Sequence, residues 1–170
     1  MNTCEEMLRD RGCLRIQKAD DIASAISQSS AVIKGKKNDE TIDIYISEDD
    51  KVGVKYARNV IEKSQRNHII VVSIEGPTPF TRKECDGHSI QFMMAKDLCF
   101  NVTKHCLVPK HEVVEQCPIK LSKDKLPRIL DTDPIVQYYN WPTGTIVRVW
   151  RCYAGHEPIP YYRCVVSLSN

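Results

Sequence analysis

Long hydrophobic runs are missing from this chain of 170 residues. No apolar stretch approaches the roughly eighteen residues that a membrane-spanning helix requires. The N-terminus carries Glu5, Glu6 and Asp10, where a secretory leader needs a basic start and an apolar core. Hydrophobic residues make up 42% of the chain and charged residues 27%, which is the balance of a soluble globular protein. We therefore expect one large or two small domains that neither span a membrane nor are secreted by that route.

The chain also lacks an excess of charge of either sign. Its 24 lysines and arginines face 22 aspartates and glutamates, so the net charge is +2. A protein that binds nucleic acid alone and without sequence preference usually shows a strong basic excess, because phosphate neutralisation supplies most of its affinity. Any contact with nucleic acid is therefore expected to be local and assisted by other chains.

Paired metal-binding cysteines are missing too, since the eight cysteines include no Cys-x-x-Cys pair. The densest group of possible ligands is Cys99, His105, Cys106, His111 and Cys117. Its spacing fits no zinc motif, and zinc needs four ligands that converge tetrahedrally. We expect reduced thiols that mostly pack as small hydrophobes, and we predict no metal site.

Catalytic signatures are equally scarce. The sequence contains no P-loop, no Gly-x-Gly-x-x-Gly and no paired-carboxylate motif. A cysteine nucleophile beside His105 or His111 would need a third orienting group and an oxyanion-binding loop, and neither is evident. The absences favour a structural or binding role, with no catalytic residue and no cofactor.

What the sequence does contain is clearest in its last third. Asp133 before Pro134 is typical of a helix N-cap followed by proline at the first helical position. We predict a short helix from Pro134 to near Asn140. Residues 145–150 and 161–167 are rich in β-branched and aromatic side chains and predict two strands. These elements make a small α/β module, and a module of this size is more credible when it is docked on a partner.

The N-terminal part predicts helices and strands in alternation. A short amphipathic helix around Met7 is expected to end at Gly12, and a second helix to begin after Asp20 as its N-cap. The polar residues 34–39 predict a loop. The alternating isoleucines of residues 41–46 predict a strand.

Further along, apolar residues at helical spacing from Val54 to Ile61 predict another helix, and the continuously apolar residues 69–74 predict a strand that is covered on both faces. A helix between two strands implies a right-handed crossover and a mixed sheet with helices packed on it. The fold class expected for the whole chain is therefore α/β (α+β).

After the buried strand, Gly76 and two prolines predict a rigid, exposed loop over residues 75–83. Residues 90–98 predict a helix that runs into a short strand at residues 99–102, and residues 103–105 a linker.

Several motifs resemble one known family. They are Leu-Val-Pro-Lys-His at residues 107–111, Leu-Pro-Arg-Ile at 126–129, Asp133-Pro134, and the closing Tyr162-Arg163. In this order and spacing they resemble the C-terminal assembly domain of the fifth subunit shared by the eukaryotic nuclear RNA polymerases I, II and III. The archaeal counterpart of that subunit has the assembly domain and lacks the N-terminal jaw domain of the eukaryotic proteins.

The N-terminal part is similar to the same family in its eukaryotic, two-domain form. The motifs are Lys-Val-Gly-Val-Lys at residues 51–55, the 69–74 strand followed by Thr78-Pro79, and Asn-Val-Thr at 101–103. The resemblance implies a jaw domain at residues 1–104 and an assembly domain at 105–170. The stretches before residue 41 and over 115–125 are shorter than in the family, which suggests a divergent member, from a large DNA virus or from a fast-evolving eukaryote.

The resemblance implies a non-catalytic subunit whose assembly domain binds the largest polymerase subunit and adjoins other small subunits, and whose jaw contacts downstream double-stranded DNA. The subunit would not form homo-oligomers, and it would lie in the nucleus if cellular, or in the virion, the virus factory or the host nucleus if viral. The implied DNA contacts are Thr78, Pro79, Thr81, Arg82 and Lys83. The implied subunit interface comprises Pro109, His111, Leu126, Pro127, Arg128, Asp133, Pro134, Arg148, Tyr162 and Arg163.

Simpler interpretations remain open from the residues alone. The 75–83 segment is also typical of an ordinary solvated turn, and the C-terminal aromatic residues could simply fill a small core. A nuclease-like enzyme would need an acidic pair and a lysine at strand ends, for which Asp43, Glu75 and Lys55 are the candidates. An independent DNA-binding module is the third class, and the near-neutral charge argues against it.

Overall fold

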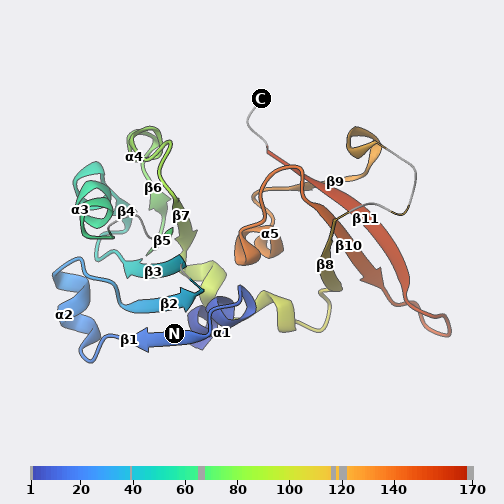
Figure 1. Cartoon of the computed structure of the whole chain (residues 1–170), viewed down its shortest axis with the longest axis horizontal. Coiled ribbons are helices and arrows are strands. Elements are labelled where there is room, and N and C mark those ends of the chain that lie inside the picture. The colour runs from blue at the N-terminus through green and yellow to red at the C-terminus, as the bar shows by residue number, and fades with distance from the viewer. Residues whose placement is uncertain (1, 39, 65–67, 116–117, 119–121, 168–170) are drawn as a thin grey trace. The chain divides into compact units, whose positions relative to one another are not determined.

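The computed structural model describes residues 2–38, 40–64, 68–115, 118 and 122–167. They form two compact units, one from Met1 to Phe100 and one from Asn101 to Asn170. Both units combine a sheet with short helices (Figure 1). The predicted α+β fold class is confirmed.

The N-terminal unit is built on a mixed five-stranded sheet. Its strands are β1 (Arg15–Lys18), β2 (Ile33–Lys37), β3 (Glu40–Ile46), β5 (His68–Ser73) and β7 (Ile90–Met94), in that spatial order. β1, β2 and β3 pair antiparallel, whereas β3, β5 and β7 run parallel. Five of the six residues of β5 are buried, as the continuously apolar run predicts for a central strand. The predicted mixed sheet and its two isoleucine-rich strands are confirmed.

Helices complete this unit. They are α1 (Asn2–Asp10), α2 (Ile22–Ser27), α3 (Val54–Ser64), α4 (Pro79–Glu84) and the 3-10 turn η1 (Ala95–Leu98). The predicted helices corresponding to α1 and α3 are confirmed. One core cluster joins Tyr45 of β3 and Val71 of β5 to Ala57 and Val60 of α3. The parallel β3–α3–β5 crossover thereby buries the apolar face of α3 against the sheet.

Two sequence predictions in this unit are wrong. The polar residues 34–39 predict a loop, yet most of them belong to β2, because both of its edges find backbone partners in β1 and β3. Gly35 belongs there for a packing reason, since an added Cβ would lie 2.9 Å from Cys13 Sγ. The N-cap of α2 is Asp21 rather than Asp20, because the Asp21 carboxylate accepts hydrogen bonds from two backbone N–H groups of the first turn.

Two further corrections concern residues 75–98. The segment 75–83 is not the predicted loop, because it contains β6 (Gly76–Pro77), which pairs in parallel with β4 (Lys51–Val52), followed by α4. Residues 90–94 are not helical as predicted, because pairing with β5 satisfies the backbone of β7 as a strand, and only residues 95–98 form a helical turn, η1. A short apolar run cannot be assigned to helix or strand by periodicity alone.

The C-terminal unit contains a four-stranded sheet in the order β8 (Lys110–Val114), β10 (Ile146–Arg151), β11 (Ile159–Val166), β9 (Arg128–Leu130). The helix α5 (Pro134–Tyr139) packs on one face, as the residues shared by one cluster show: Ile129, Val136, Val147, Val149 and Val165. The short turns η2 (Val102–Lys104) and η3 (Lys123–Lys125) precede the sheet strands β8 and β9. The expected strand at residues 99–102 is wrong, since η2 begins there instead.

The prediction of α5 and of its two following strands is confirmed. Asp133 Oδ1 accepts a hydrogen bond from Ile135 N at 2.9 Å, and Pro134 occupies the first turn. Asn140 ends the helix with φ 54°, a left-handed conformation that asparagine tolerates better than most residues. Local chemistry therefore fixes both ends of a helix that is only six residues long.

Candidate functional site

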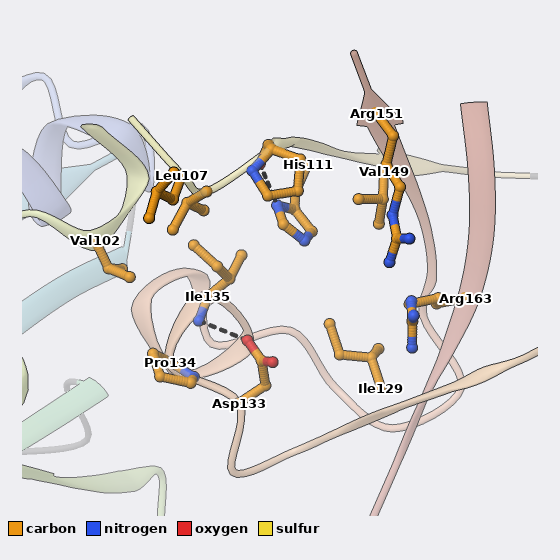
Figure 2. Close-up of a pocket in the computed structure, with 12 residues that line it drawn as sticks. Val102, Leu107, His111, Ile129, Asp133, Pro134, Ile135, Val149, Arg151 and Arg163 are labelled. Atoms are coloured by element: carbon orange, nitrogen blue, oxygen red, sulfur yellow. Dashed lines mark hydrogen bonds between the residues drawn. The ribbon is translucent and has the colours of Figure 1, made fainter. Parts of the chain in front are cut away.

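A pocket of about 380 Å³ lies on the α5 side of the C-terminal sheet (Figure 2). It is surrounded by the segment from η2 into β8, by the start of α5, and by the strands β9, β10 and β11. The lining residues are mostly apolar, and the polar ones are few: His111, Asp133, Arg151 and Arg163. Concave, largely apolar hollows with a few convergent polar groups are typical of binding sites.

The two arginines enter the pocket from adjacent strands. β10 and β11 pair antiparallel, with Val147 opposite Arg163, so these two side chains lie on the same face of the sheet. Arg151 is four residues after Val147 in β10, and alternate residues of a strand share a face, so Arg151 lies on that face too. Figure 2 shows both guanidinium groups directed into the hollow. Arg163 Nη1 donates to the Arg128 carbonyl at 2.9 Å, and the Arg151 guanidinium lies 5.1 Å from the Tyr161 ring centroid. These contacts orient both cations.

His111 faces the arginines across the pocket. Its Nδ1 lies 2.7 Å from the Pro109 carbonyl oxygen, which can only accept, so Nδ1 carries the proton. Burial lowers the pKa of His111, and the positive charge of Arg163 acts in the same direction, while the carbonyl contact and Asp133 oppose the shift. The imidazole is therefore neutral near pH 7, with Nε2 as a hydrogen-bond acceptor.

The opposite face of the same sheet carries a charged network. Glu112 Oε2 accepts hydrogen bonds from Arg148 at 2.6 Å and from Trp150 Nε1 at 2.9 Å, and Lys110 lies 2.6 Å from Oε1. Hydrogen bonds from Lys110, Trp150 and Arg148 lower the pKa of Glu112 to about 2. The Arg148 guanidinium also stacks 4.9 Å from the Trp150 ring centroid. These side chains line a second, larger groove of about 840 Å³.

The residues expected at a subunit interface are therefore not on one surface. Five of them line the first pocket: Pro109, His111, Asp133, Pro134 and Arg163. Arg148 and Tyr162 point to the other face of the sheet, where Tyr162 packs beside buried Leu126. Pro127 and Arg128 are exposed at the start of β9.

Arg151 and Leu107 also line this pocket, although the expected interface residues do not include them. The alternation of Val147, Val149 and Arg151 along one strand could have indicated that Arg151 shares their face. Leu107 is 84% exposed because it lies in the turn before β8. No pattern in the sequence indicates that exposure.

The residues expected at DNA lie on and before α4 in the N-terminal unit. Thr78 caps this helix, and its Oγ1 accepts a hydrogen bond from Thr81 N at 3.2 Å. Thr81 is fully buried, and its hydroxyl donates to the Val52 carbonyl at 2.8 Å. The two threonines therefore hold α4 against β4, while Arg82 and Lys83 remain exposed.

Phe80 of α4 has a side chain that is 80% exposed. Arg82 and Lys83 follow in the last turn, and in the part of the chain that the structure describes neither cation forms an ion pair. Arg58 of α3 bonds Glu84 at 2.7 Å, which ties the end of α4 to its neighbour. The exposed side chains of α4 thus combine two cations with one aromatic ring.

The carboxylates considered for a nuclease lie far apart. Asp43 is buried at the middle of β3, beside Ile69 of β5. The last residue of β5 lies four residues after Ile69, so it is about 13 Å further along the strand. Glu75 follows that end of β5. Glu75 is exposed and pairs with Lys51 at 3.0 Å, and Lys55 is exposed on α3. These three groups do not converge.

Metal-binding and membrane-spanning features are absent from the described ranges. Those residues include no group of three histidine, cysteine or acidic side chains placed to hold a metal ion. Cys99 and Cys106 are exposed thiols, and Cys117 lies outside the described residues. No helix there is long and apolar enough to cross a membrane.

Comparison with known proteins gives a consistent result. The family model of the RNA polymerase Rpb5 C-terminal domain matches residues 100–165. The subunit RPABC1 of DNA-directed RNA polymerases I, II and III from Dictyostelium discoideum is 31% identical over 135 residues, which cover 68% of each chain. The subunit RPABC1 from Caenorhabditis briggsae is 28% identical over 142 residues, which cover 74% of this chain and 67% of the relative.

An archaeal protein matches a shorter part of the chain. The DNA-directed RNA polymerase subunit Rpo5 of Methanococcus maripaludis is 33% identical over 75 residues, which cover 40% of this chain and 96% of the relative. The archaeal match and the eukaryotic matches agree with the resemblance carried by the motifs at residues 107–111, 126–129 and 162–163. The chain therefore belongs to the family of the fifth subunit of DNA-directed RNA polymerases.

Proposed function

We propose that the chain is a non-catalytic subunit of a multisubunit DNA-directed RNA polymerase. The observation that carries this proposal is the family match over residues 100–165, which spans nearly the whole C-terminal unit. In this role the active site belongs to other chains, and the protein contributes binding surfaces. The assembled complex would lie in the nucleus if the host is cellular.

The C-terminal unit, the assembly domain of this proposal, anchors to the largest polymerase subunit. Support comes from the pocket beside α5, where five of the ten expected interface residues, Arg163 among them, lie together with Arg151. Arginine and aromatic residues are the types that dominate the energetics of protein interfaces. Exposed Leu107 and Tyr161 add apolar area near this pocket. Other small polymerase subunits adjoin the same domain, and a second copy of this chain is not part of the assembly.

The N-terminal unit acts as a jaw that contacts downstream duplex DNA through α4. Arg82 and Lys83 would bind phosphates, and such contacts position a duplex without reading its sequence. Thr78 and Thr81 serve this contact indirectly, because their hydroxyl groups hold α4 on β4. The near-neutral net charge is consistent with a contact that needs the other subunits for affinity.

The nuclease alternative is disfavoured by the separation of Asp43 from Glu75. Carboxylates that share a magnesium ion must both reach it, at bond lengths of about 2 Å. A magnesium-dependent cleavage assay on the purified chain separates the two functions. Sustained cleavage that disappears in Glu75→Ala would overturn the non-catalytic role.

The test of the proposed function is affinity purification of the tagged chain from its native source, followed by mass spectrometry. The two largest polymerase subunits should be recovered with the wild type. A double variant, Arg128→Glu with Arg151→Glu, changes only exposed side chains and should recover much less of both. Lys125→Ala, also exposed and outside the pocket, is the matched control and should behave as the wild type.

A second pair of variants separates the jaw from the assembly domain. Arg82→Glu with Lys83→Glu should leave recovery of the large subunits unchanged and reduce photo-crosslinking of downstream DNA to this chain in the purified complex. Recovery of the chain without polymerase subunits would overturn the proposed function. Unchanged crosslinking in an intact complex would overturn only the DNA contact.

A further inference from the structure

We propose that the pocket beside α5 binds an acidic, apolar-flanked segment of a partner polypeptide, whose carboxylate lies between Arg151 and Arg163. The inference rests on the proposed function, because the partner is then another subunit of the same polymerase. The proposed function locates the interface, and the charges and apolar side chains of the pocket indicate what kind of segment binds there.

The charges around the pocket select an anion. Arg151 and Arg163 bring two guanidinium groups, and Asp133 is the only carboxylate among the lining residues. Asp133 Oδ1 already accepts the N–H of Ile135 as the N-cap of α5. His111 is neutral there, so it adds no charge to the pocket. Guanidinium groups bind carboxylates through paired, charge-assisted hydrogen bonds, so a carboxylate is the group that this pair of cations fits best.

The floor of the pocket selects apolar side chains on either side of that carboxylate. Ile129, Ile135 and Val149 are buried and line the pocket together with the arginines. Leu107, at 84% exposure, also lines the pocket, and its burial by a partner would remove a large apolar side chain from water. A ligand that used only the charges would leave this area uncovered.

The surface around Arg151 indicates a polypeptide rather than a small molecule. Tyr161 stacks with Arg151, and both Tyr161 and Ile159 are at least 40% exposed on the adjacent strand. Exposed apolar side chains therefore continue beyond the pocket, as expected of a surface that an extended chain covers. His111 Nε2 supplies an acceptor for a backbone N–H of that chain, because its Nδ1 proton is already donated to Pro109.

A phage-displayed library of random nonapeptides, panned against the immobilised full-length chain, tests this chemistry without a known ligand. The expected result is enrichment of peptides in which aspartate or glutamate adjoins leucine, isoleucine or phenylalanine. One enriched peptide is then synthesised with a fluorescent label, together with a copy in which asparagine or glutamine replaces its acidic residue. Fluorescence polarisation should show the neutral copy binding at least about tenfold more weakly.

Variants locate the binding. Arg151→Ala and Arg163→Ala should each weaken binding of the labelled acidic peptide about tenfold, and Lys125→Ala should leave its affinity unchanged. Arg151→Lys keeps the charge but loses the guanidinium fork, so it should fall between alanine and wild type. Arg151 is exposed, so its variants keep the packed core even if Arg163→Ala fails to fold.

Three outcomes would overturn the inference: enrichment of peptides without a carboxylate, equal binding by the arginine variants and the wild type, or no enrichment at all. Each leaves the proposed function intact if the tagged chain still recovers the two largest polymerase subunits. If that recovery fails while acidic peptides bind as expected, the pocket chemistry stands and the polymerase role does not.

Discussion

Replacing Thr81 by valine removes one buried hydroxyl while it keeps the volume and branching of the side chain. Thr81 Oγ1 donates to the Val52 carbonyl at 2.8 Å and lies 2.8 Å from Thr78 Oγ1. Each lost hydrogen bond costs about 1 kcal/mol net, and the new buried methyl group returns about 0.8 kcal/mol. We expect the local opening of α4 to become easier by about 1 kcal/mol.

Hydrogen–deuterium exchange with mass spectrometry measures this opening directly. The relevant amides are those of Thr81, Arg82 and Cys85, which bond to Thr78 Oγ1, the Thr78 carbonyl and the Thr81 carbonyl. A change of about 1 kcal/mol makes their exchange about fivefold faster. Lys83→Ala, on the exposed side of the same helix, is the control and should change exchange by less than about twofold.

A double-mutant cycle with Thr78→Ala makes the test stricter. Thr78 and Thr81 share one hydrogen bond, so the two substitutions should cost less together than the sum of their separate costs. Strict additivity, or wild-type exchange in Thr81→Val, would show that this hydroxyl pair does not hold α4 in place.

Two further predictions concern one site in each unit. Because the folded pKa of Glu112 is about 2, below its unfolded value near 4.5, its stabilising contacts are complete above pH 4.5 and are lost as the pH falls toward 2. The fluorescence of Trp150, recorded in a Trp141→Phe variant, should follow this loss with a transition midpoint near pH 2. A transition midpoint near pH 4.5 would contradict the lowered pKa of Glu112. Gly35→Ala should cost about 1–3 kcal/mol by urea denaturation, because its Cβ would lie 2.9 Å from Cys13 Sγ. Gly53→Ala, with nothing within 4 Å of its Cβ, should unfold like the wild type.

Elements whose ends are set by local chemistry could be predicted from the sequence. The helix α5 is the clearest example, since Asp133, Pro134 and Asn140 fix both of its ends through their own backbone and side-chain preferences. The strand β5 follows from a continuous run of apolar residues. The same capping chemistry at Thr78-Pro79 is compatible with α4, but glycine and proline in the same stretch favour a loop as readily.

Elements that depend on partners distant in sequence could not be predicted in this way. The polar residues of β2 form a strand because β1 and β3 lie on either side. β7 carries a buried glutamine, Gln91, among apolar residues, and pairing with β5 decides its conformation. In both cases the strand is stabilised by backbone hydrogen bonds to strands that are distant in sequence. The strand's own sequence therefore shows no periodic pattern that would predict it.

The candidate interface shows the same limit at the level of single side chains. Tyr162 and Arg163 are adjacent in the sequence, and the resemblance implies one interface for both. In a strand, adjacent residues point to opposite faces, so Arg163 enters the pocket beside α5 whereas Tyr162 lies across the sheet with Arg148. A partner that contacts all three must pass around an edge of this sheet. A single flat docking surface cannot satisfy the predicted interface, which is why an extended segment is the better candidate for the pocket.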